Sequence, residues 1–371
     1  MSNQGCGGYY QLAEKGTQLS TSVFDILNKP VQNVIIQLGF SKPTAPQESA
    51  IPPILDGKNV LLVAATGSGK TEAVLLPILS NFIQQVDKTG ISIIYITPLR
   101  ALNRDMTLRL SNWADQLGFT VEVRHGDTKA KIRRRQAISP PNMLVTTPET
   151  LQAILPGSRM QKHLRGVQYV IIDEVHEIAE DKRGVQLTVA LERLAEITGK
   201  EFQRVGLSAT VGNSQEIAQF IAGKDRSIEV VTVPLPKSFQ YVVESPLPTD
   251  LDYDAAQDLR TAPEAAARIN RIIDLVKEHN STLIFVNART NAEMLGHKFS
   301  QLTPNIAVHH GSLSREERSR IEDEFKDGVL KAIVCTSTLQ LGIDIGHIDL
   351  VIQYLSPRQV TSLIQRVGRS G

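Results

Sequence analysis

The chain has 371 residues, of which 41% are hydrophobic and 21% are charged, and its formal net charge is +1. This length predicts two domains of ordinary size, and the composition excludes a fibrous or disordered protein. The near-neutral charge excludes a generally basic surface, so any phosphate-binding surface has to be confined to one groove. Cys6 and Cys335 are too few for a disulfide framework or a zinc site. No apolar run reaches the roughly 18 to 20 residues that span a bilayer, and no signal-peptide core is visible, which predicts a cytoplasmic protein without a membrane partner.

Short apolar runs alternate with amphipathic stretches along the whole chain. The runs predicted to be buried parallel strands are Val60–Ala65, Ile91–Thr97, Met143–Thr147, Val167–Ile172, Val205–Ser208, Thr282–Val286, Ala332–Thr336 and Leu350–Gln353. Between two of these runs, Leu187, Leu191, Leu194 and Ile197 recur at helical spacing. This alternation predicts an α/β fold in which parallel sheets carry helices on both faces.

A proline-rich stretch, Val233–Asp252, separates the two halves of this pattern. Proline removes the backbone donors that a sheet or helix would need, so we interpret the stretch as the crossing between two lobes. The predicted division is a tail (1–20), a first domain (21–235), a linker (236–252) and a second domain (253–371). A long surface loop inside one domain is the alternative interpretation.

A glycine-rich loop follows the first predicted strand and precedes a predicted helix. Its sequence is Ala64-Ala65-Thr66-Gly67-Ser68-Gly69-Lys70-Thr71. Gly67 and Gly69 let backbone N–H groups fold around phosphate oxygens, and the helix predicted to begin near Thr71 adds the positive end of its dipole. Lys70 is expected to reach the β- and γ-phosphates of ATP, and Thr71 to bind Mg²⁺. Ala64 stands where the general pattern has glycine, so a plain glycine-rich turn is the alternative.

A pair of carboxylates follows another buried strand. Asp173 and Glu174 come directly after the strand that ends at Ile172. Asp173 is placed to anchor Mg²⁺, and Glu174 to orient or deprotonate the attacking water. An acidic pair by itself is usually a solvated loop. Because a phosphate-binding loop lies upstream, the pair instead favours hydrolysis of ATP with Mg²⁺.

The chain resembles the superfamily 2 helicases of the DEAD/DEAH-box type in a series of ordered motifs. Asp173–His176 and Ser208–Thr210 resemble motifs II and III. The other matches, in the family's order, are Phe40 to Gln47 (Q-motif), Thr97–Leu102 (Ia), Thr147–Glu149 (Ib), Ile284–Arg289 (IV), His310–Leu313, Thr336–Asp344 (V) and Gln365–Arg369 (VI). The stretches 95–106, 173–186 and 356–360 are similar to the large helicase-related (Lhr) group of bacteria and archaea.

The resemblance implies two RecA-like P-loop domains, the second of them incomplete. It also implies ATP-dependent movement along single-stranded DNA, 3′ to 5′, with displacement of a paired strand in DNA repair. The contacts it implies with nucleic acid are those of Thr97, Pro98, Arg100, Thr147, Asn287, Arg289, Gly311 and Thr336. Donors of this kind suit phosphate and sugar, which carry no sequence information. For each threonine, turn or helix-cap chemistry is the alternative.

Further roles follow from the same resemblance. Phe40, Gln47 and Asp344 are expected to contact the nucleotide, with Gln47 reading the adenine edge. Arg366 and Arg369 fit the need for an arginine that stabilises developing charge, and Arg369 fits better because it follows Gly368. A solvated basic face is the alternative for this pair. The residues expected to couple ATP state to lobe movement are His176, Ser208, Thr210 and Gln365.

Two other functions stay open at this point. One is an RNA-dependent ATPase that clamps or remodels RNA, so RNA or an RNA–DNA hybrid is a possible partner. The other is a catalytically weak nucleic-acid-binding fragment. The sequence ends at Gly371, before another arginine of the family's motif VI, so we expect weak or no unwinding and an impaired ATPase. We expect a monomer. The basic run 129–135 favours a solvated helix face over an additional nucleic-acid contact.

Overall fold

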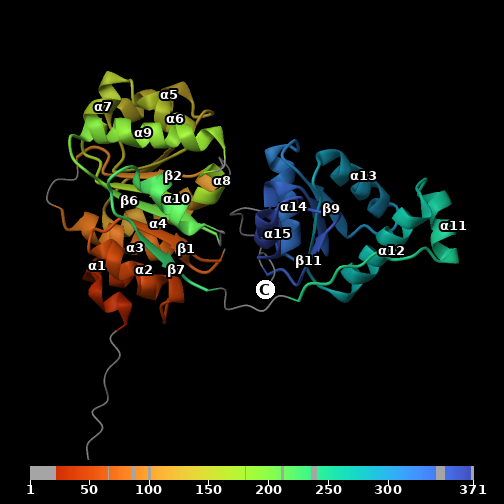
Figure 1. Cartoon of the computed structure of the whole chain (residues 1–371). Helices are drawn as coiled ribbons and strands as arrows, with labels where there is room; N and C mark the ends of the chain where they lie inside the picture. Colours follow the sequence, from red (N-terminus) through yellow and green to blue (C-terminus); the bar gives the residue numbers. More distant parts are fainter. Residues whose placement is uncertain are drawn as a thin grey trace, which may run out of the picture.

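The computed structural model describes residues 22–65, 67–85, 89–98, 102–179, 181–209, 213–234, 240–339 and 347–368, without the side chains of 102–109, 315 and 361. Its strands form two parallel sheets, one in each lobe (Figure 1). The first sheet has the strand order β3-β4-β2-β5-β6-β1-β7, and the second has the order β11-β8-β10-β9. The predicted architecture of two α/β lobes with parallel sheets is confirmed.

Seven strands, with the helices that cover them, are described in the first lobe. The strands are β1 (Val60–Val63), β2 (Ile93–Ile96), β3 (Val121–Arg124), β4 (Met143–Thr146), β5 (Tyr169–Ile172), β6 (Gln203–Ser208) and β7 (Glu229–Thr232). The helices are η1 (Val23–Ile26), α1 (Lys29–Gln37), α2 (Ala45–Leu55), α3 (Lys70–Ile83), α4 (Leu102–Leu117), α5 (Ala130–Ile138), α6 (Pro148–Ile154), α7 (Ser158–Leu164), α8 (Val175–Ala179), α9 (Lys182–Thr198) and α10 (Ser214–Ala222).

Alternate residues of each central strand face two different cores. In β1, Val60 and Leu62 pack into the core beneath α1 to α4, whereas Leu61 and Val63 pack into the core beneath α6 to α10. The reason is the two-residue period of a strand, which presents successive side chains to opposite faces of the sheet. Both faces are therefore apolar, as expected for a parallel sheet covered on each side.

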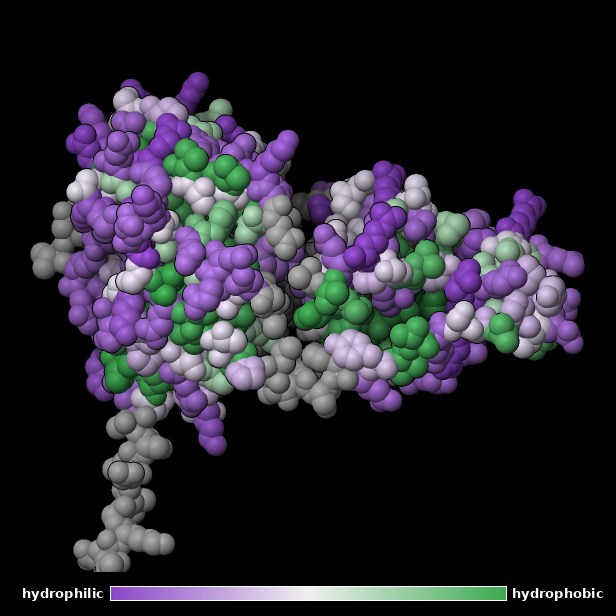
Figure 2. Space-filling model, in the orientation of Figure 1, coloured by the Kyte–Doolittle hydropathy of each residue, from purple (hydrophilic) through white to green (hydrophobic). Residues whose placement is uncertain are grey.

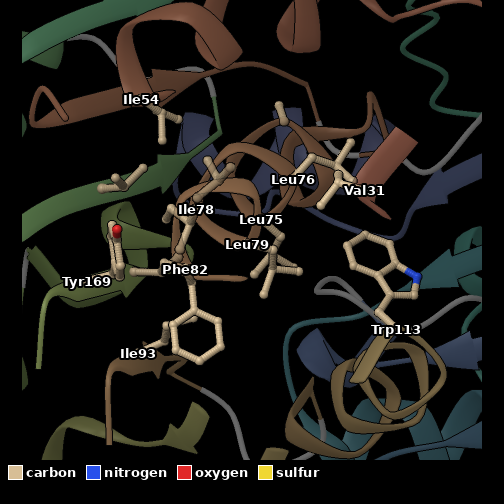
Figure 3. Close-up of a cluster of buried hydrophobic side chains, with 14 of the residues drawn as sticks. Val31, Ile54, Leu75, Leu76, Ile78, Leu79, Phe82, Ile93, Trp113 and Tyr169 are labelled. Carbon is tan, nitrogen blue, oxygen red and sulfur yellow. The ribbon is translucent and has the colours of Figure 1, made fainter. Parts of the chain in front are cut away.

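Helix α3, which starts at the glycine-rich loop, lies at the centre of the first core. Leu75, Leu76, Ile78, Leu79 and Phe82 project from it toward neighbouring strands and helices (Figure 3). The Phe82 ring meets the ring of Phe119 edge to face, with centroids 6.1 Å apart. Burial on almost every side fixes α3, and with it the loop at its N-terminus.

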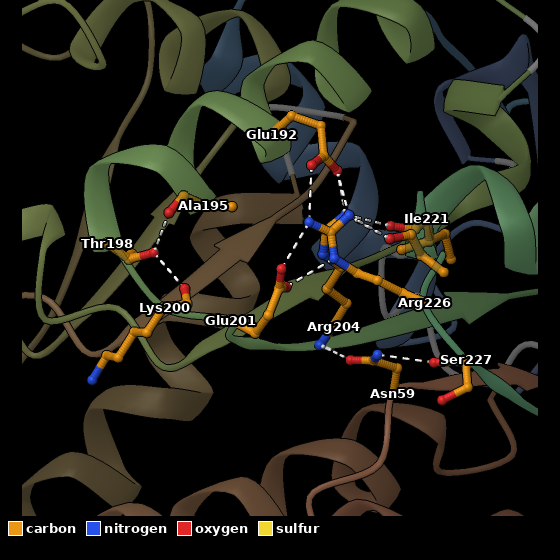
Figure 4. Close-up of polar contacts among 11 residues, drawn as sticks. Asn59, Glu192, Ala195, Thr198, Lys200, Glu201, Arg204, Ile221, Arg226 and Ser227 are labelled. Carbon is orange, nitrogen blue, oxygen red and sulfur yellow. Dashed lines mark hydrogen bonds and ion pairs between the residues drawn. The ribbon is translucent and has the colours of Figure 1, made fainter. Parts of the chain in front are cut away.

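A charged cluster built around one buried arginine lies at the amino edge of the first sheet. Arg204 is only 1% exposed, and it donates hydrogen bonds to Glu192 and to the carbonyls of Ile221 and Ala222 (Figure 4). Arg226 forms ion pairs of 2.8 Å with Glu192 and with a second glutamate, Glu201. The cluster ties α9, β6 and α10 together at the end of β6 that lies away from its last residue.

The second lobe has four described strands. They are β8 (Thr282–Phe285), β9 (Ile306–His309), β10 (Ala332–Cys335) and β11 (Leu350–Gln353). Its helices are α11 (Asp250–Asp258), α12 (Pro263–Glu278), α13 (Arg289–Ser300), α14 (Arg315–Lys326), η2 (Ser337–Leu339) and α15 (Val360–Val367). One core lies beneath α12 and α13, and another lies on the opposite face of the sheet, beneath α14.

The segment between the lobes has no helix or strand at 233–234 and 240–249. Figure 1 shows it passing beneath the second lobe to reach α11. Glu244 in this segment forms a 2.7 Å ion pair with Arg271 on α12. Helix α11 begins at Asp250, inside the predicted linker 236–252. The domain boundaries stay a prediction, and the predicted tail 1–20 lies outside the described residues.

The surface agrees with this division into buried cores and exposed faces. Hydrophilic residues prevail over the viewed face of the first lobe (Figure 2). Among the helices that the structure describes, none is both long and apolar enough to cross a bilayer. The location in the cell stays a prediction.

Candidate nucleotide-binding and coupling site

The predicted catalytic residues follow strands that lie side by side in the first sheet. Strand β6 pairs with both β1 and β5, and Val63 stands opposite Ser208 in the register. Ile96 stands opposite Ile172 in the pair formed by β2 and β5. Because parallel strands end at the same edge, the glycine-rich loop, Thr97, Asp173 and Ser208 all meet there. This is the edge at which α/β sheets bind ligands.

The glycine-rich loop needs its glycines for conformation and for space. Gly67 has φ +75° and Gly69 has φ +86°, values that residues with a Cβ rarely adopt. A Cβ on Gly69 would also lie 3.0 Å from Nε2 of Gln47 and 3.1 Å from Oγ1 of Thr44. The loop is therefore packed against the N-terminus of α2, and it delivers the chain into α3 at Lys70. Thr66 lies outside the described residues.

Lys70 is buried at the start of α3 and is directed back into the loop. Its Nζ donates a 2.9 Å hydrogen bond to the Ala64 carbonyl and a 3.3 Å bond to the Ser208 carbonyl. Ser68 in turn donates a 2.7 Å bond from its hydroxyl to the Ala65 carbonyl. Only neutral oxygens accept these two bonds from Lys70, and a phosphate oxygen is a stronger acceptor for a lysine ammonium group.

Asp173 is a buried carboxylate with defined donors. One oxygen accepts a 2.7 Å hydrogen bond from the Tyr95 hydroxyl, and the other accepts a 2.9 Å bond from the Glu174 backbone N–H. Burial and the neighbouring Glu174 charge raise the pKa of Asp173 to about 7, although the Tyr95 hydrogen bond and Lys70 oppose them. Burial also raises the pKa of Tyr95 well above its ordinary value, so its hydroxyl keeps the proton that it donates.

Glu174 combines backbone strain with an unsatisfied oxygen. Its φ is +45°, a left-handed value that costs energy for any residue other than glycine. Its Oε2 is buried and has no hydrogen-bond partner among the described residues, although Nε2 of His176 lies 3.6 Å away. Strain and orphaned polar atoms are typical of sites that receive a ligand.

The donor set fits Mg²⁺ better than a metal held by protein alone. Thr71 and Asp173 offer only oxygen, which is what a hard cation prefers. The described residues contain no group of three or more histidine, cysteine or carboxylate side chains that could hold a metal. Mg²⁺ usually has one or two carboxylates and completes its shell with phosphates and water. The orphaned Glu174 oxygen leaves an acceptor for such a water.

The two Q-motif residues lie beside the glycine-rich loop. Gln47 is 3% exposed, and its Oε1 accepts a 2.9 Å hydrogen bond from the Thr44 backbone N–H as part of the capping box of α2. Phe40 is partly buried against the first core. Their contacts with an adenine ring stay a prediction.

A polar bridge joins the lobes at His176. Nδ1 of His176 accepts a 3.2 Å hydrogen bond from the Ala209 backbone N–H and lies 3.2 Å from the Ser208 hydroxyl. On the other side of the ring, Nε2 lies 2.5 Å from the side-chain amide of Gln365 in α15. The same amide donates a 2.8 Å bond to Glu177. Three of the predicted coupling residues thus lie together, and Thr210 lies outside the described residues.

Arg366 is buried inside the second lobe. It donates hydrogen bonds of 3.2 Å to Oδ1 of Asn287 and 2.5 Å to Oε1 of Gln353, and its guanidinium carbon lies 5.3 Å from the centre of the Phe285 ring. The structure thereby brings together two predicted site residues, Arg366 and Asn287. Two others of this half, Arg369 and Asp344, lie outside the described residues.

Some of the first-lobe residues that are predicted to contact nucleic acid already form hydrogen bonds within the protein. Thr97 is fully buried, and its hydroxyl has no hydrogen-bond partner among the described residues. Thr147 caps α6, where its hydroxyl accepts a 3.4 Å bond from the Thr150 N–H, so the helix-cap chemistry named as the alternative is present. Arg183 donates 2.8 Å to the Pro98 carbonyl and 2.5 Å to Glu149. Arg183 therefore links Pro98 of motif Ia with Glu149 of motif Ib. Arg100 lies outside the described residues.

In the second lobe these contacts remain open to solvent. Gly311 is exposed, and Arg289 has 61% of its side chain exposed, with Glu293 3.9 Å away. Thr336 follows β10 and is half-buried. Contacts of these residues with nucleic acid stay a prediction.

Sequence reasoning missed Tyr95 and Arg183. Tyr95 begins the Lhr-like stretch 95–106, but it lies within an apolar run, so nothing in the pattern distinguished its hydroxyl from a packing role. Arg183 lies in the Lhr-like stretch 173–186, seven residues after His176, and only the fold brings it to Pro98 and Glu149.

Comparison with known proteins places these residues in a family context. The DEAD/DEAH box helicase model matches residues 44–218, and the helicase conserved C-terminal domain model matches residues 265–371. The ATP-dependent helicase Lhr-Core of Saccharolobus solfataricus is 39% identical over 349 residues, which are 88% of this chain and 39% of that protein. The chain thus spans about two fifths of the length of this curated relative.

Solved structures agree. The Mycobacterium smegmatis helicase Lhr bound to ssDNA and AMP-PNP matches with a TM-score of 0.80 and 35% identity, over 94% of this chain and 46% of that chain. The DEAD-box helicase Mss116 bound to ssRNA and UDP-BeF matches with a TM-score of 0.73 and 21% identity, over 93% of this chain and 71% of that chain. The second likeness concerns the fold alone.

Proposed function

Because the chain belongs to the DEAD/DEAH-box helicases, we propose that it hydrolyses ATP to move along single-stranded DNA in the 3′ to 5′ direction. We further propose that this movement separates paired strands during DNA repair. The observation that carries the proposal is the joint placement of Lys70, Asp173 and Glu174 at one sheet edge, with His176 beside them bonded to Gln365 of the other lobe.

The first lobe would bind and activate the nucleotide. Lys70 would exchange its two carbonyl acceptors for β- and γ-phosphate oxygens, and the backbone N–H groups of residues 65–71 would surround the phosphates. Thr71 and Asp173 would hold Mg²⁺, which when bound neutralises charge on the phosphates. Glu174 would orient the attacking water, and its orphaned Oε2 is the atom available to accept the proton.

The second lobe would complete the site and transmit its state. An arginine that reaches the transferred phosphate typically contributes about 10³ to 10⁵ in rate, and Arg369 is proposed for that role. Arg366 is bonded to Asn287 and Gln353, which favours Arg369 further. Asp344 is proposed to contact the nucleotide or to hold Arg369 in place. Closure on ATP and opening after hydrolysis would then alternate the grip of the two lobes on the strand.

Single-stranded DNA is the favoured partner because the Mycobacterium smegmatis relative was solved with ssDNA and shares 35% identity with this chain. The proposed contacts come from Thr97, Pro98, Arg100 and Thr147 in the first lobe, and from Asn287, Arg289, Gly311 and Thr336 in the second. We expect ATPase activity that single-stranded DNA stimulates.

The first experiment measures phosphate release without nucleic acid, with single-stranded DNA and with single-stranded RNA. Lys70→Ala is expected to abolish nucleotide binding, and Glu174→Gln to retain binding while losing hydrolysis. Stimulation by RNA in place of DNA would replace the proposal with the RNA clamp. No ATP-dependent phosphate release under any condition would leave a nucleic-acid-binding fragment.

The second experiment tests direction. Displacement of a short DNA duplex is measured with a 3′ tail or a 5′ tail on the loading strand, at equal lengths. Activity with the 3′ tail alone is expected. Equal displacement from both tails would contradict directional movement.

A further inference from the structure

We propose that Tyr95 is a positioning residue that holds the Asp173 carboxylate in the arrangement that receives a magnesium–nucleotide complex. This inference rests on the proposed function, because it assumes that the same edge of the sheet binds nucleotide with Mg²⁺. It adds a residue that begins the Lhr-like stretch 95–106 and to which the sequence analysis assigned no role.

The hydroxyl of Tyr95 is directed at one of the two expected magnesium ligands. It donates a 2.7 Å hydrogen bond to one oxygen of Asp173. The side chain of Tyr95 therefore fixes the orientation of that carboxylate from the neighbouring strand.

This arrangement leaves acceptor positions on Asp173 for a cation. Each oxygen of Asp173 accepts one protein hydrogen bond, from Tyr95 or from the Glu174 N–H. Each carboxylate oxygen has about two acceptor positions, so each has one left for a cation or its water. The two hydrogen bonds thus orient the carboxylate without occupying it.

The ring of Tyr95 fixes where this hydroxyl lies. Tyr95 is fully buried on β2, the strand between β4 and β5, and its ring belongs to the core beneath α1 to α4. A ring packed in this way has no alternative rotamer to visit without displacing its neighbours. Phenylalanine would preserve that packing and remove only the hydroxyl, which makes Tyr95→Phe a specific test.

Tyr169 provides the matched control. It is a tyrosine on the neighbouring strand β5 and contributes to the same core, but it stands at the amino end of the strand (Figure 3). Its hydroxyl accepts a 3.4 Å hydrogen bond from Gln85 and does not touch Asp173. Tyr169→Phe therefore makes the same chemical change at the opposite edge of the sheet.

The experiment measures the affinity of a fluorescent ATP analogue across a series of Mg²⁺ concentrations, and also in EDTA, without nucleic acid. A hydrogen bond to a charged group contributes roughly 1.5 to 3 kcal/mol, so Tyr95→Phe should raise the half-saturating Mg²⁺ concentration about tenfold or more. Affinity in EDTA should change less than about twofold, because the phosphate contacts of the loop remain. Tyr169→Phe should alter neither value.

The double variant Tyr95→Phe with Asp173→Asn decides whether Tyr95 acts through Asp173. If it does, Tyr95→Phe adds little once Asp173 is asparagine. An undiminished additional loss in that background would overturn the proposal. If Tyr95→Phe alone unfolds the chain, circular dichroism of the double variant replaces the binding test. Recovery of the fold supports the pairing with Asp173, and continued unfolding assigns Tyr95 to the core alone.

The outcomes also separate this inference from the proposed function. Magnesium-dependent nucleotide binding that is identical in the unchanged chain and in Tyr95→Phe overturns the role of Tyr95 and leaves the proposed function intact. A complete lack of such binding by the unchanged chain overturns both.

Discussion

Removing the side chain of Gln365 should uncouple the lobes while leaving nucleotide binding intact. Gln365→Ala deletes the 2.5 Å polar contact with Nε2 of His176 and a hydrogen bond to the Glu177 carboxylate. The first contributes roughly 1 kcal/mol and the second about 1.5 kcal/mol, the low end for a charged acceptor because Glu177 is 32% exposed. A loss of about 2 to 3 kcal/mol corresponds to a shift of about 30- to 150-fold in the equilibrium for lobe closure.

The assay is nucleic-acid-stimulated phosphate release, compared through a double-mutant cycle with His176→Ala. Gln365→Ala should lower the stimulated kcat/KM by about 30-fold or more and His176→Ala by about fivefold or more, and the double variant should be little worse than Gln365→Ala. ATP affinity without nucleic acid should stay within about twofold, since neither residue touches the glycine-rich loop. Gln359→Ala, an exposed glutamine at the start of the same helix, is the control. Strictly additive losses from the two single changes would refute the bridge.

Three further outcomes follow from the first lobe. Gly69→Ala should weaken nucleotide binding at least about tenfold, because the new Cβ meets Gln47 and φ is positive; Gly118→Ala, with positive φ but nothing within 4 Å, should lower stability alone. Arg204→Ala should lower the free energy of unfolding by about 3 kcal/mol in a denaturant titration, because the buried carbonyls of Ile221 and Ala222 lose the hydrogen bonds that Arg204 donates. ATP affinity should stay unchanged, because these carbonyls lie far from the nucleotide site. Burial raises the pKa of Glu192, but hydrogen bonds from Arg226 and Arg204 outweigh it and hold that pKa below its ordinary value. The stability that this carboxylate contributes is therefore present above about pH 4.3 and is lost as pH falls further, by less than about 1 kcal/mol because Glu192 is half exposed. Glu192→Gln should reduce the dependence of the free energy of unfolding on pH in this range. An unchanged pH dependence would contradict the assignment.

The strands that the sequence predicted are mostly those with fully buried side chains. Val60–Val63 and Tyr169–Ile172 are buried at every position, so their apolar runs were visible without an alignment. Three strands, β3, β7 and β9, went unpredicted, and each lies at the edge of its sheet. Glu122 in β3 and Glu229 in β7 break the apolar pattern because an edge strand has one side open to water. Such edge strands form because they pair with a neighbouring strand, and this pairing cannot be read from the sequence.

The candidate site divides in a similar way. Motif residues such as Lys70 and Asp173 were predictable because phosphate and cation chemistry restricts both residue type and spacing. Tyr95 was not, because a tyrosine in an apolar strand is ordinary core, and only the closeness of β2 to β5 reveals its bond to Asp173. Arg366 illustrates the converse. Its motif predicted a catalytic role, whereas its bonds to Asn287 and Gln353 could be known only from the folded second lobe.

Strand β6 has a mechanical consequence for a two-lobe motor. Its six residues extend about 20 Å. Near one end, Arg204 is held by the charged cluster, and at the other end Ser208 contacts His176, which meets the second lobe. A displacement applied at Ser208 therefore cannot be absorbed by movement at the far end of the strand. We expect the first lobe to rotate as a rigid body when Ser208 is displaced, with the residues around Arg204 moving together with the strand.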